Sequence, residues 1–177
     1  MNATNMVFAG FGGQGVLFTG KIVAYAGLID NREVTWLPSY GPEMRGGTAN
    51  CSVCISDNPI GSPLVDEPNV LIAMNGASYD KFIDTVSPDG VVVIDSSIVK
   101  PKKRREDVKL FEVPATQLSQ EEGLEGGANM ILLGKMLKET GTASSETIAS
   151  SVNKCVPSKK QHLLENNIRA IELGMSL

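Results

Sequence analysis

Residues 6–28 read MVFAGFGGQGVLFTGKIVAYAGL, and this stretch decides the fold. A short apolar run, Met6–Ala9, ends abruptly at a glycine-rich turn that extends from Gly10 to Gly15. The next segment, Val16–Leu28, is apolar on nearly every side of a helix, which is typical of a helix buried between layers rather than one lying on a surface. The chain is therefore predicted to open with a strand, a glycine loop and a buried helix.

Outward from this stretch, the chain alternates between further strands and helices. Strands are predicted at residues 33–37, 48–56, 70–74, 91–95 and 108–113, and helices at 77–86, 127–139, 144–155 and 158–173. The runs at 70–74 and 91–95 are continuously apolar, as expected of strands covered on both faces. Ser158-Lys159-Lys160-Gln161 has the form of a capping box at the start of the last helix. The pattern predicts one domain over residues 1–177, a three-layer α/β/α Rossmann-like sheet that is mostly parallel and leaves room for antiparallel strands.

The composition excludes several classes of protein. With 16 Lys and Arg against 20 Asp and Glu, the 177-residue chain has a net charge of −4, which argues against a nucleic-acid partner. Three cysteines cannot form a disulfide framework, and their odd number fits a reducing compartment. No apolar run approaches the length of about 18 residues that a membrane span needs, and the N-terminus lacks the features of a signal peptide. We expect a cytoplasmic protein with no membrane partner.

The glycine loop matches two nucleotide-binding motifs, and each match is incomplete. Gly10, Gly12 and Gly15 satisfy G-x-G-x-x-G, but NAD also needs an acid at the end of the second strand, and Asp30 precedes that strand. Gly15–Lys21 fits G-x-x-x-x-G-K, but Ile22 replaces the Ser or Thr that would bind magnesium, and Lys21 is expected inside the buried helix. One interpretation is that the glycine loop is only a structural turn. The alternative is that the loop binds a nucleotide and the chain is an autonomous nucleotide-binding Rossmann-like protein.

Two further patterns favour structural roles. Cys51 and Cys54 form a C-x-x-C on a predicted strand, where side chains three residues apart point to opposite faces of the sheet. Cys155 is the one other cysteine, so the chain cannot supply the four thiolates that a zinc or iron–sulfur site of this kind needs.

The basic run Lys100–Arg105 is followed at once by two acids and is interpreted as a solvated loop. The alternative is a patch that docks an acidic partner or a phosphate-bearing ligand. The single histidine, His162, is expected at the surface, which leaves no histidine-based catalytic triad or metal site.

Three motifs taken together are more specific than any of these patterns. They are GFGGQG at 10–15, SYGPEMRGG at 39–47 and NMILLG at 129–134. In this order they closely resemble the gamma subunit, or gamma domain, of the 2-oxoacid:ferredoxin oxidoreductases, over almost the whole chain. The resemblance implies membership of an enzyme complex that decarboxylates a 2-oxoacid on thiamine diphosphate. In such a complex the acyl group passes to coenzyme A, and electrons leave through iron–sulfur clusters to ferredoxin. The second motif is more similar to the 2-oxoglutarate and branched-chain members than to the pyruvate members.

The sequence limits what this chain contributes to such a complex. It contains no G-D-G of the kind that holds thiamine diphosphate in this family, and it has no cysteine run for a cluster. We therefore expect that this chain binds none of these cofactors and carries no catalytic residue alone. The resemblance implies separate alpha, beta and ferredoxin-like delta subunits as partners, together with ferredoxin, and an isolated chain that is inactive.

The resemblance also implies a set of site residues on two loops and one helix. The first loop supplies backbone N–H groups and the Gln14 amide to a cleft at the carboxyl edge of the sheet, the second lies on the same edge, and Asn129 caps a helix or reaches the cleft. These residues are Gly12, Gly13, Gln14, Gly15, Tyr40, Glu43, Arg45, Gly46 and Asn129. Arg45 suits bidentate pairing with a carboxylate or phosphate, or a simple pair with Glu43. The two loops are expected to dock the thiamine-bearing subunits and to frame the approach of coenzyme A.

Overall fold

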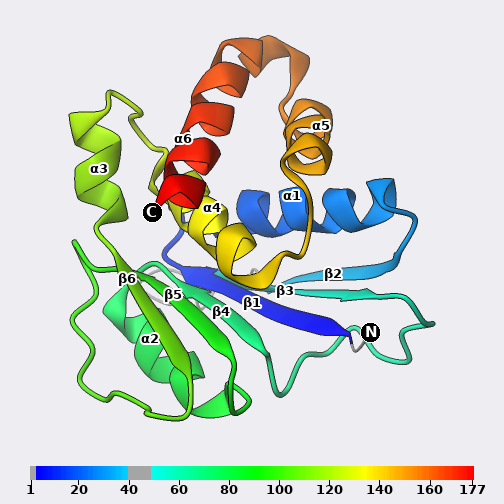
Figure 1. Cartoon of the computed structure of the whole chain (residues 1–177), viewed down its shortest axis with the longest axis vertical. Helices are drawn as coiled ribbons and strands as arrows, with labels where there is room; N and C mark the ends of the chain where they lie inside the picture. Colours follow the sequence, from blue (N-terminus) through cyan, green and yellow to red (C-terminus); the bar gives the residue numbers. More distant parts are fainter. Residues whose placement is uncertain (1–2, 40–48) are drawn as a thin grey trace.

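A six-stranded mixed sheet forms the centre of the molecule (Figure 1). The computed structural model describes residues 3–39 and 49–177. The strand order is β2-β3-β1-β4-β5-β6, with β3 antiparallel to both β1 and β2 and the other neighbouring pairs parallel. The strands are β1 (Thr4–Gly10), β2 (Glu33–Ser39), β3 (Ala49–Ser56), β4 (Val70–Ala73), β5 (Val91–Asp95) and β6 (Lys109–Val113). The prediction of a mainly parallel sheet with antiparallel strands is confirmed.

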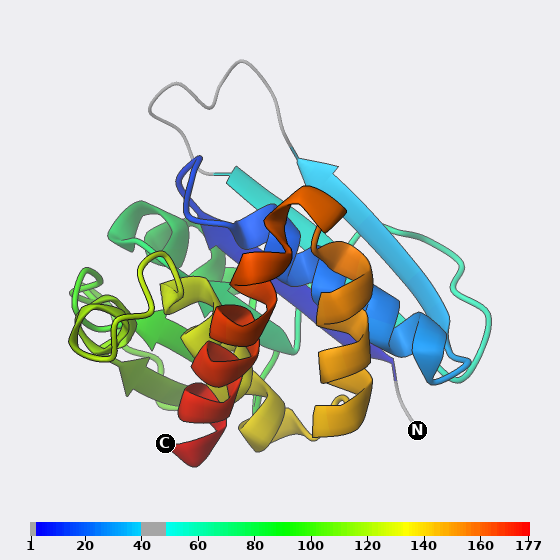
Figure 2. The same ribbon diagram turned by 90° about the horizontal axis from the view of Figure 1, so that it is seen from above.

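One face of the sheet carries two tiers of helices. α1 (Val16–Ile29) and α4 (Ala128–Thr140) lie directly on the strands, and α5 (Ser145–Cys155) and α6 (Leu164–Ser176) pack above them (Figures 1 and 2). This tiering explains why α1 and α4 are apolar almost all round, since each is covered on both sides. Alternate residues of β1, Met6 and Phe8, point into the core on this face. The expected buried helix after the glycine loop is confirmed.

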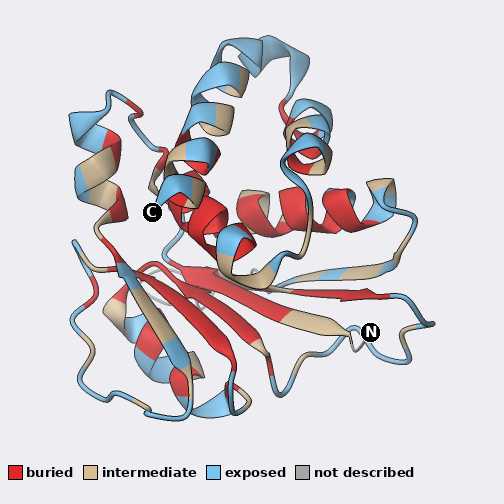
Figure 3. Ribbon diagram, in the orientation of Figure 1, coloured by how far each residue is buried: buried red, intermediate tan, exposed pale blue. Residues whose placement is uncertain are grey.

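The opposite face has a thinner cover. α2 (Gly76–Phe82) and the short 3₁₀ turn η2 (Ile83–Thr85) lie under β1, β4 and β5 (Figure 1). Val7 and Ala9 of β1 face this second, smaller core, where Tyr79 and Ile83 are fully buried. Figure 3 shows that burial is concentrated in the central strands and in α1 and α4, while the outer tier of helices is largely exposed. The layered α/β/α arrangement is therefore asymmetric.

Two glycines bring α4 and α6 into backbone contact. A Cβ on Gly134 would collide with the carbonyl oxygen of Ile171, and a Cβ on Gly174 would collide with the carbonyl oxygen of Ile131. The two helices therefore pack without a side chain between them at this crossing. Any larger residue at either position must push the helices apart, because the obstacle is backbone rather than a movable side chain.

The last third of the chain departs from the sequence prediction in two places. The helix α3 (Ala115–Glu121) was not predicted. The capping box at Ser158 was wrong: residues Ser158–Leu163 form a 3₁₀ turn, η3, and α6 begins only at Leu164. Gln161 does not close the box; its amide instead donates toward the carbonyl of Val156, 3.5 Å away. The connection between α5 and α6 is therefore a separate element rather than a helix end.

No helix in the described part of the chain is long and apolar enough to cross a membrane.

Candidate functional site

The glycine loop turns sharply from β1 into α1. Gly13 and Gly15 have φ angles of 91° and 76°, in the left-handed region that side chains disfavour. Gly15 is the N-cap of α1, and no side chain caps the helix. A Cβ on Gly15 would also overlap the amide of Asn129. The predicted turn is present, and Gly15 is required by both its conformation and its neighbour.

The side chain of Gln14 closes the crevice between β1 and β4. Its Oε1 accepts from the Phe11 backbone N–H (2.6 Å) and from Asn75 Nδ2 (3.2 Å), and its Nε2 donates to the Met74 carbonyl (3.1 Å). The amide therefore joins the glycine loop to the loop that follows β4, and the expectation that it faces a cleft stays a prediction. α1 and α2 leave the adjacent strands β1 and β4 toward opposite faces (Figure 1), so this is the crevice where open α/β sheets usually bind nucleotides. Gln14 fills it.

Asn129 ties the start of α4 to the start of α1. Its Nδ2 donates to Thr19 Oγ1 (3.2 Å) and, more weakly, to the Gly15 carbonyl (3.4 Å). Thr19 Oγ1 in turn donates to the same carbonyl at 3.1 Å. No side chain caps α4, whose N-cap is Gly127. Of the two roles expected for Asn129, capping its own helix is therefore wrong, and reaching the cleft stays a prediction.

The second predicted loop lies mostly outside the described residues. Tyr40, Glu43, Arg45 and Gly46 belong to the interval 40–48, which the structure does not describe. The ends of the interval are defined, because Ser39 pairs with Asn50 and Ala49 pairs with Gly10. These ends lie at the edge of the sheet where the glycine loop begins.

Two cavities flank the glycine loop and share Gly15 and Phe18. The smaller, about 280 Å³, is lined by Phe11, Gly12, Gly13, Gly15, Val16, Leu17, Phe18 and Ala49. The larger, about 570 Å³, is lined by Gly15, Phe18, Lys21, Gly126, Asn129, Cys155, Val156, Pro157, Lys160, Leu163 and Asn167. We call the larger one the α1–η3 cavity. Its volume lies within the range of small-molecule sites.

Most residues of the α1–η3 cavity were missed by sequence reasoning. Lys21 was expected inside a buried helix, but it is only partly buried and lines the cavity. Lys160 and Cys155 were not assigned to any site. The available signal was the segment 153–164, NKCVPSKKQHLL, which carries three lysines and no acid.

The cysteines are buried and separate. Cys51 packs in the core beneath α1, and burial raises the pKa of its thiol to about 12, against smaller opposing effects from hydrogen bonds with Trp36 and Gly20. Cys54, three residues later on β3, therefore points to the other face of the sheet. No group of three or more metal-binding side chains occurs among residues 3–39 and 49–177. Both cysteines lie on a strand, as predicted, and the expected divergence of their thiols is confirmed.

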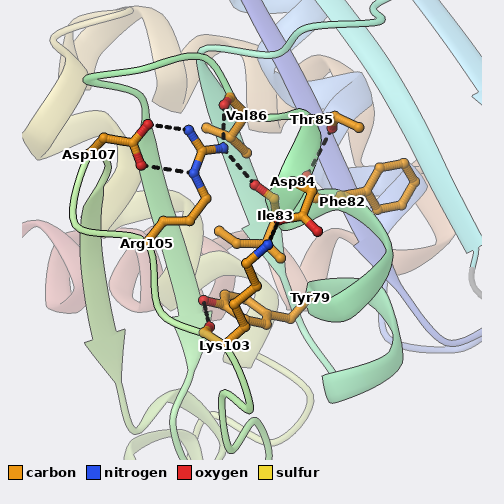
Figure 4. Close-up of polar contacts among 9 residues, drawn as sticks. All are labelled: Tyr79, Phe82, Ile83, Asp84, Thr85, Val86, Lys103, Arg105 and Asp107. Carbon is orange, nitrogen blue, oxygen red and sulfur yellow. Dashed lines mark hydrogen bonds and ion pairs between the residues drawn. The ribbon is translucent and has the colours of Figure 1, made fainter.

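The basic run Lys100–Arg105 binds the protein's own acids and carbonyls. Lys103 pairs with Asp84, and Arg104 makes two 2.9 Å hydrogen bonds with Glu112. Arg105 is held from two sides (Figure 4), by Asp107 and by the carbonyls of Ile83 and Val86. We call residues 100–107 the strap, because the segment holds η2 and the end of α2 against β6. Its charges are used internally, which favours the loop interpretation over a docking patch.

These ion pairs shift the ionisation of two carboxyl groups. The hydrogen bond from Arg105 holds the pKa of Asp107 below its usual range. The hydrogen bond from Arg104 does the same for Glu112. Both acids therefore remain charged, and keep their partners, into mildly acidic solution.

Comparison with known proteins places the fold among oxidoreductase subunits. A family model described as pyruvate ferredoxin/flavodoxin oxidoreductase matches residues 5–177. The 2-oxoglutarate synthase subunit KorC of Methanocaldococcus jannaschii is 37% identical over 169 residues, which cover 94% of this chain and 89% of that protein. The ketoisovalerate oxidoreductase subunit VorA of Methanothermobacter thermautotrophicus is 38% identical over 166 residues. This chain spans about a third of the length of VorA, with 34% of that protein covered.

A solved structure is similar over nearly its whole length. The gamma subunit of a keto/oxoacid ferredoxin oxidoreductase from Geobacter sulfurreducens superimposes with a TM-score of 0.82 at 30% identity, covering 97% of this chain and 96% of that one. The α/β fold predicted from the sequence is therefore one already observed in a gamma subunit.

Proposed function

The chain belongs to the pyruvate ferredoxin/flavodoxin oxidoreductase family, and from this premise we propose that it serves as the gamma subunit of a 2-oxoacid:ferredoxin oxidoreductase complex. The observation that carries the proposal is the match to the KorC subunit, which extends over nearly all of both chains.

The described residues do not fit the cofactors of such a complex. The sequence has no G-D-G of the kind that holds thiamine diphosphate in this family. An iron–sulfur cluster needs four ligands, whereas the sequence has three cysteines, of which Cys51 and Cys54 point to opposite faces of β3 and Cys155 ends α5. We propose that alpha, beta and delta subunits carry the thiamine diphosphate and the clusters, that ferredoxin accepts the electrons, and that the isolated chain is inactive.

The edge of the sheet beside the glycine loop is the proposed working surface. Backbone N–H groups at the start of α1 lack a side-chain cap, two cavities flank the loop, and the ends of the 40–48 interval lie beside it. We propose that this edge docks on the thiamine-bearing subunits and frames the approach of coenzyme A. Tyr40, Glu43, Arg45 and Gly46 contribute from the second loop.

This surface is tested by Arg45→Ala in the assembled complex. We expect weaker assembly or a higher KM for coenzyme A, because Arg45 is the residue suited to pair with a carboxylate or phosphate. Lys138→Ala, an exposed change near the end of α4, is the matched control. If Arg45→Ala matches the control in both assembly and KM, the docking role is wrong.

The proposed substrate is 2-oxoglutarate or a branched-chain 2-oxoacid. The motif at residues 39–47 supports this choice, as do the names of the two relatives, a 2-oxoglutarate synthase subunit and a ketoisovalerate oxidoreductase subunit. Assays of the purified complex with 2-oxoglutarate, 2-oxoisovalerate and pyruvate separate these possibilities. A clear preference for pyruvate would contradict the proposal.

The subunit role is tested by affinity purification of the tagged chain from its own cells under strict anaerobiosis. We expect two or three further polypeptides to co-purify, together with thiamine diphosphate and iron. A chain that elutes alone, colourless and free of thiamine, would refute the subunit role.

A further inference from the structure

Asn75 lies in the short connection between β4 and α2, and only 2% of it is exposed. Its Oδ1 accepts from the backbone N–H of Ser78 (2.8 Å), which makes Asn75 the N-cap of α2. Its Nδ2 donates to Oε1 of Gln14 in the glycine loop (3.2 Å). One buried amide therefore links α2, on one face of the sheet, to the loop that starts α1, on the other face (Figure 1).

Backbone groups fix the orientation of both amides. Gln14 Oε1 also accepts from the Phe11 N–H, and Gln14 Nε2 donates to the Met74 carbonyl. Turning this amide over would place donor against donor and acceptor against acceptor. The Ser78 N–H likewise requires an oxygen from Asn75, which leaves the NH2 group of Asn75 for Gln14. Asn75 is therefore the donor of this pair, and Gln14 is the acceptor.

Gly10 makes room for the Gln14 amide. A Cβ on Gly10 would lie 2.8 Å from Gln14 Oε1 and 3.2 Å from the Met74 Cβ, so an added side chain would have to displace the amide. Gln14 thus folds back over the first glycine of the G-x-G-x-x-G motif, which in dinucleotide-binding loops permits the tight turn. In this chain that glycine accommodates a side chain of the protein itself.

From these contacts we infer that Asn75 is a positioning residue, which acts through Gln14 to hold the glycine loop in the shape that meets the partner subunits and coenzyme A. The Gln14 amide ties down the backbone of Phe11, whose side chain is 42% exposed and lines the smaller cavity. Without the Asn75 donor, Gln14 Oε1 loses one of its two partners, and the loop is held less firmly. The inference rests on the proposed function, because the loop belongs to the proposed working surface.

Hydrogen exchange of the Phe11 amide in the purified full chain, followed by NMR, tests the link. Asn75→Asp keeps an oxygen for the Ser78 N–H but presents a second acceptor to Gln14. We expect the Phe11 amide to exchange at least tenfold faster in this variant. Asn69→Asp is the matched control, because the Asn69 amide also bonds to two backbone groups, at the opposite end of β4. It should leave the exchange of Phe11 unchanged.

Kinetics of the assembled complex test the positioning role. We expect Asn75→Asp to raise the KM for coenzyme A at least threefold with little change in kcat. Beside Gln14→Ala the same substitution should add nothing, because Asn75 acts only through Gln14. Asn75→Ser keeps an N-cap but is too short to reach Gln14, and it replaces Asn75→Asp if circular dichroism shows that the latter does not fold.

Three results would overturn the inference. They are a Phe11 amide that exchanges at the wild-type rate in the Asn75 variant, equal acceleration in Asn69→Asp, and a KM for coenzyme A that is unchanged or that rises equally beside Gln14→Ala. The exchange is measured on the chain alone. Its failure is therefore distinguishable from failure of the proposed function, which the co-purification tests.

Discussion

The molecule contains two basic segments that are used in opposite ways. In the strap, residues 100–107, four arginine or lysine side chains are paired with carboxylates, and Arg105 also reaches two carbonyls. In the segment 154–160, no such pairs occur among the described residues, and Lys160 lines a cavity with Lys21. The comparison teaches that a run of positive charge indicates a binding surface only when its charges are not already neutralised by the protein.

The two segments are also held in place by different forces. The strap is fixed by polar contacts, whereas the wall of the α1–η3 cavity depends on the packing of α6 against α4. Changes that break polar contacts should therefore affect one segment, and changes that disturb helix packing should affect the other.

The largest expected effect is that of Gly134→Ala, on the cavity side. The new Cβ collides with the Ile171 carbonyl, and the helices must separate, so we expect a loss of about 3 kcal/mol in the free energy of unfolding. Urea denaturation measures this loss. Gly12→Ala is the control, because a Cβ there has open space around it. Equal stability of the two variants would mean that the close crossing of α4 and α6 is not what holds the cavity wall.

The next largest effect is expected in the strap. Arg105→Ala removes the ion pair with Asp107 and leaves the carbonyls of Ile83 and Val86 without their donor, which should lower the unfolding free energy by about 2 kcal/mol. Lys160→Ala, which removes a charge with no acidic partner, should change it by less than about 0.5 kcal/mol. Thermal unfolding of the two variants side by side tests the comparison directly. A larger loss in Lys160→Ala would reverse it.

A smaller effect is expected for the polar anchor of the cavity. Asn129→Ala removes the hydrogen bonds to Thr19 and Gly15 and should cost about 1 kcal/mol in urea denaturation. Asn167→Ala, another cavity residue but one with no hydrogen bond to a described residue, is the control and should be nearly neutral. Similar losses for both would remove the distinct role given to Asn129.

The smallest effect is a dependence on acid. Asp107 and Glu112 have pKa values lowered in the folded state by Arg105 and Arg104. Their contribution to stability is therefore fully present above the unfolded pKa values of about 4, and it is lost as the pH falls through the lower, folded values. Hydrogen exchange between pH 6 and pH 3 should show the strap opening before the segment 154–160. In the variant Glu112→Gln this acid dependence should decrease, and an unchanged profile would contradict the ion-pair explanation.

The sequence was sufficient to predict most of the strands and the helices of the first tier. The strands β4 and β5 are continuous apolar runs, and the glycine loop has glycines where φ is positive. α3 was missed because Ala115–Glu121 is short and mostly polar, which leaves no periodic signal. The capping box failed because Gln161 bonds to a carbonyl in the preceding connection.

The candidate site was less predictable. Gln14 bonds to Met74, 60 residues away, and Asn129 bonds to Gly15, 114 residues away; no local pattern encodes such contacts. The α1–η3 cavity likewise joins residues from α1, α4 and η3, so its charge could be recognised only in the folded chain. Tyr40, Glu43, Arg45 and Gly46 lie outside the described residues, and their role remains a prediction.

The most direct test of the central claim, that this chain is a working subunit, is reconstitution of the complex with and without it. The other subunits are purified anaerobically from cells that lack this chain, and ferredoxin reduction is followed with 2-oxoglutarate and coenzyme A. We predict little activity until the purified chain is added, and no activity from the chain alone. Full activity without the chain, unchanged by its addition, would contradict the account.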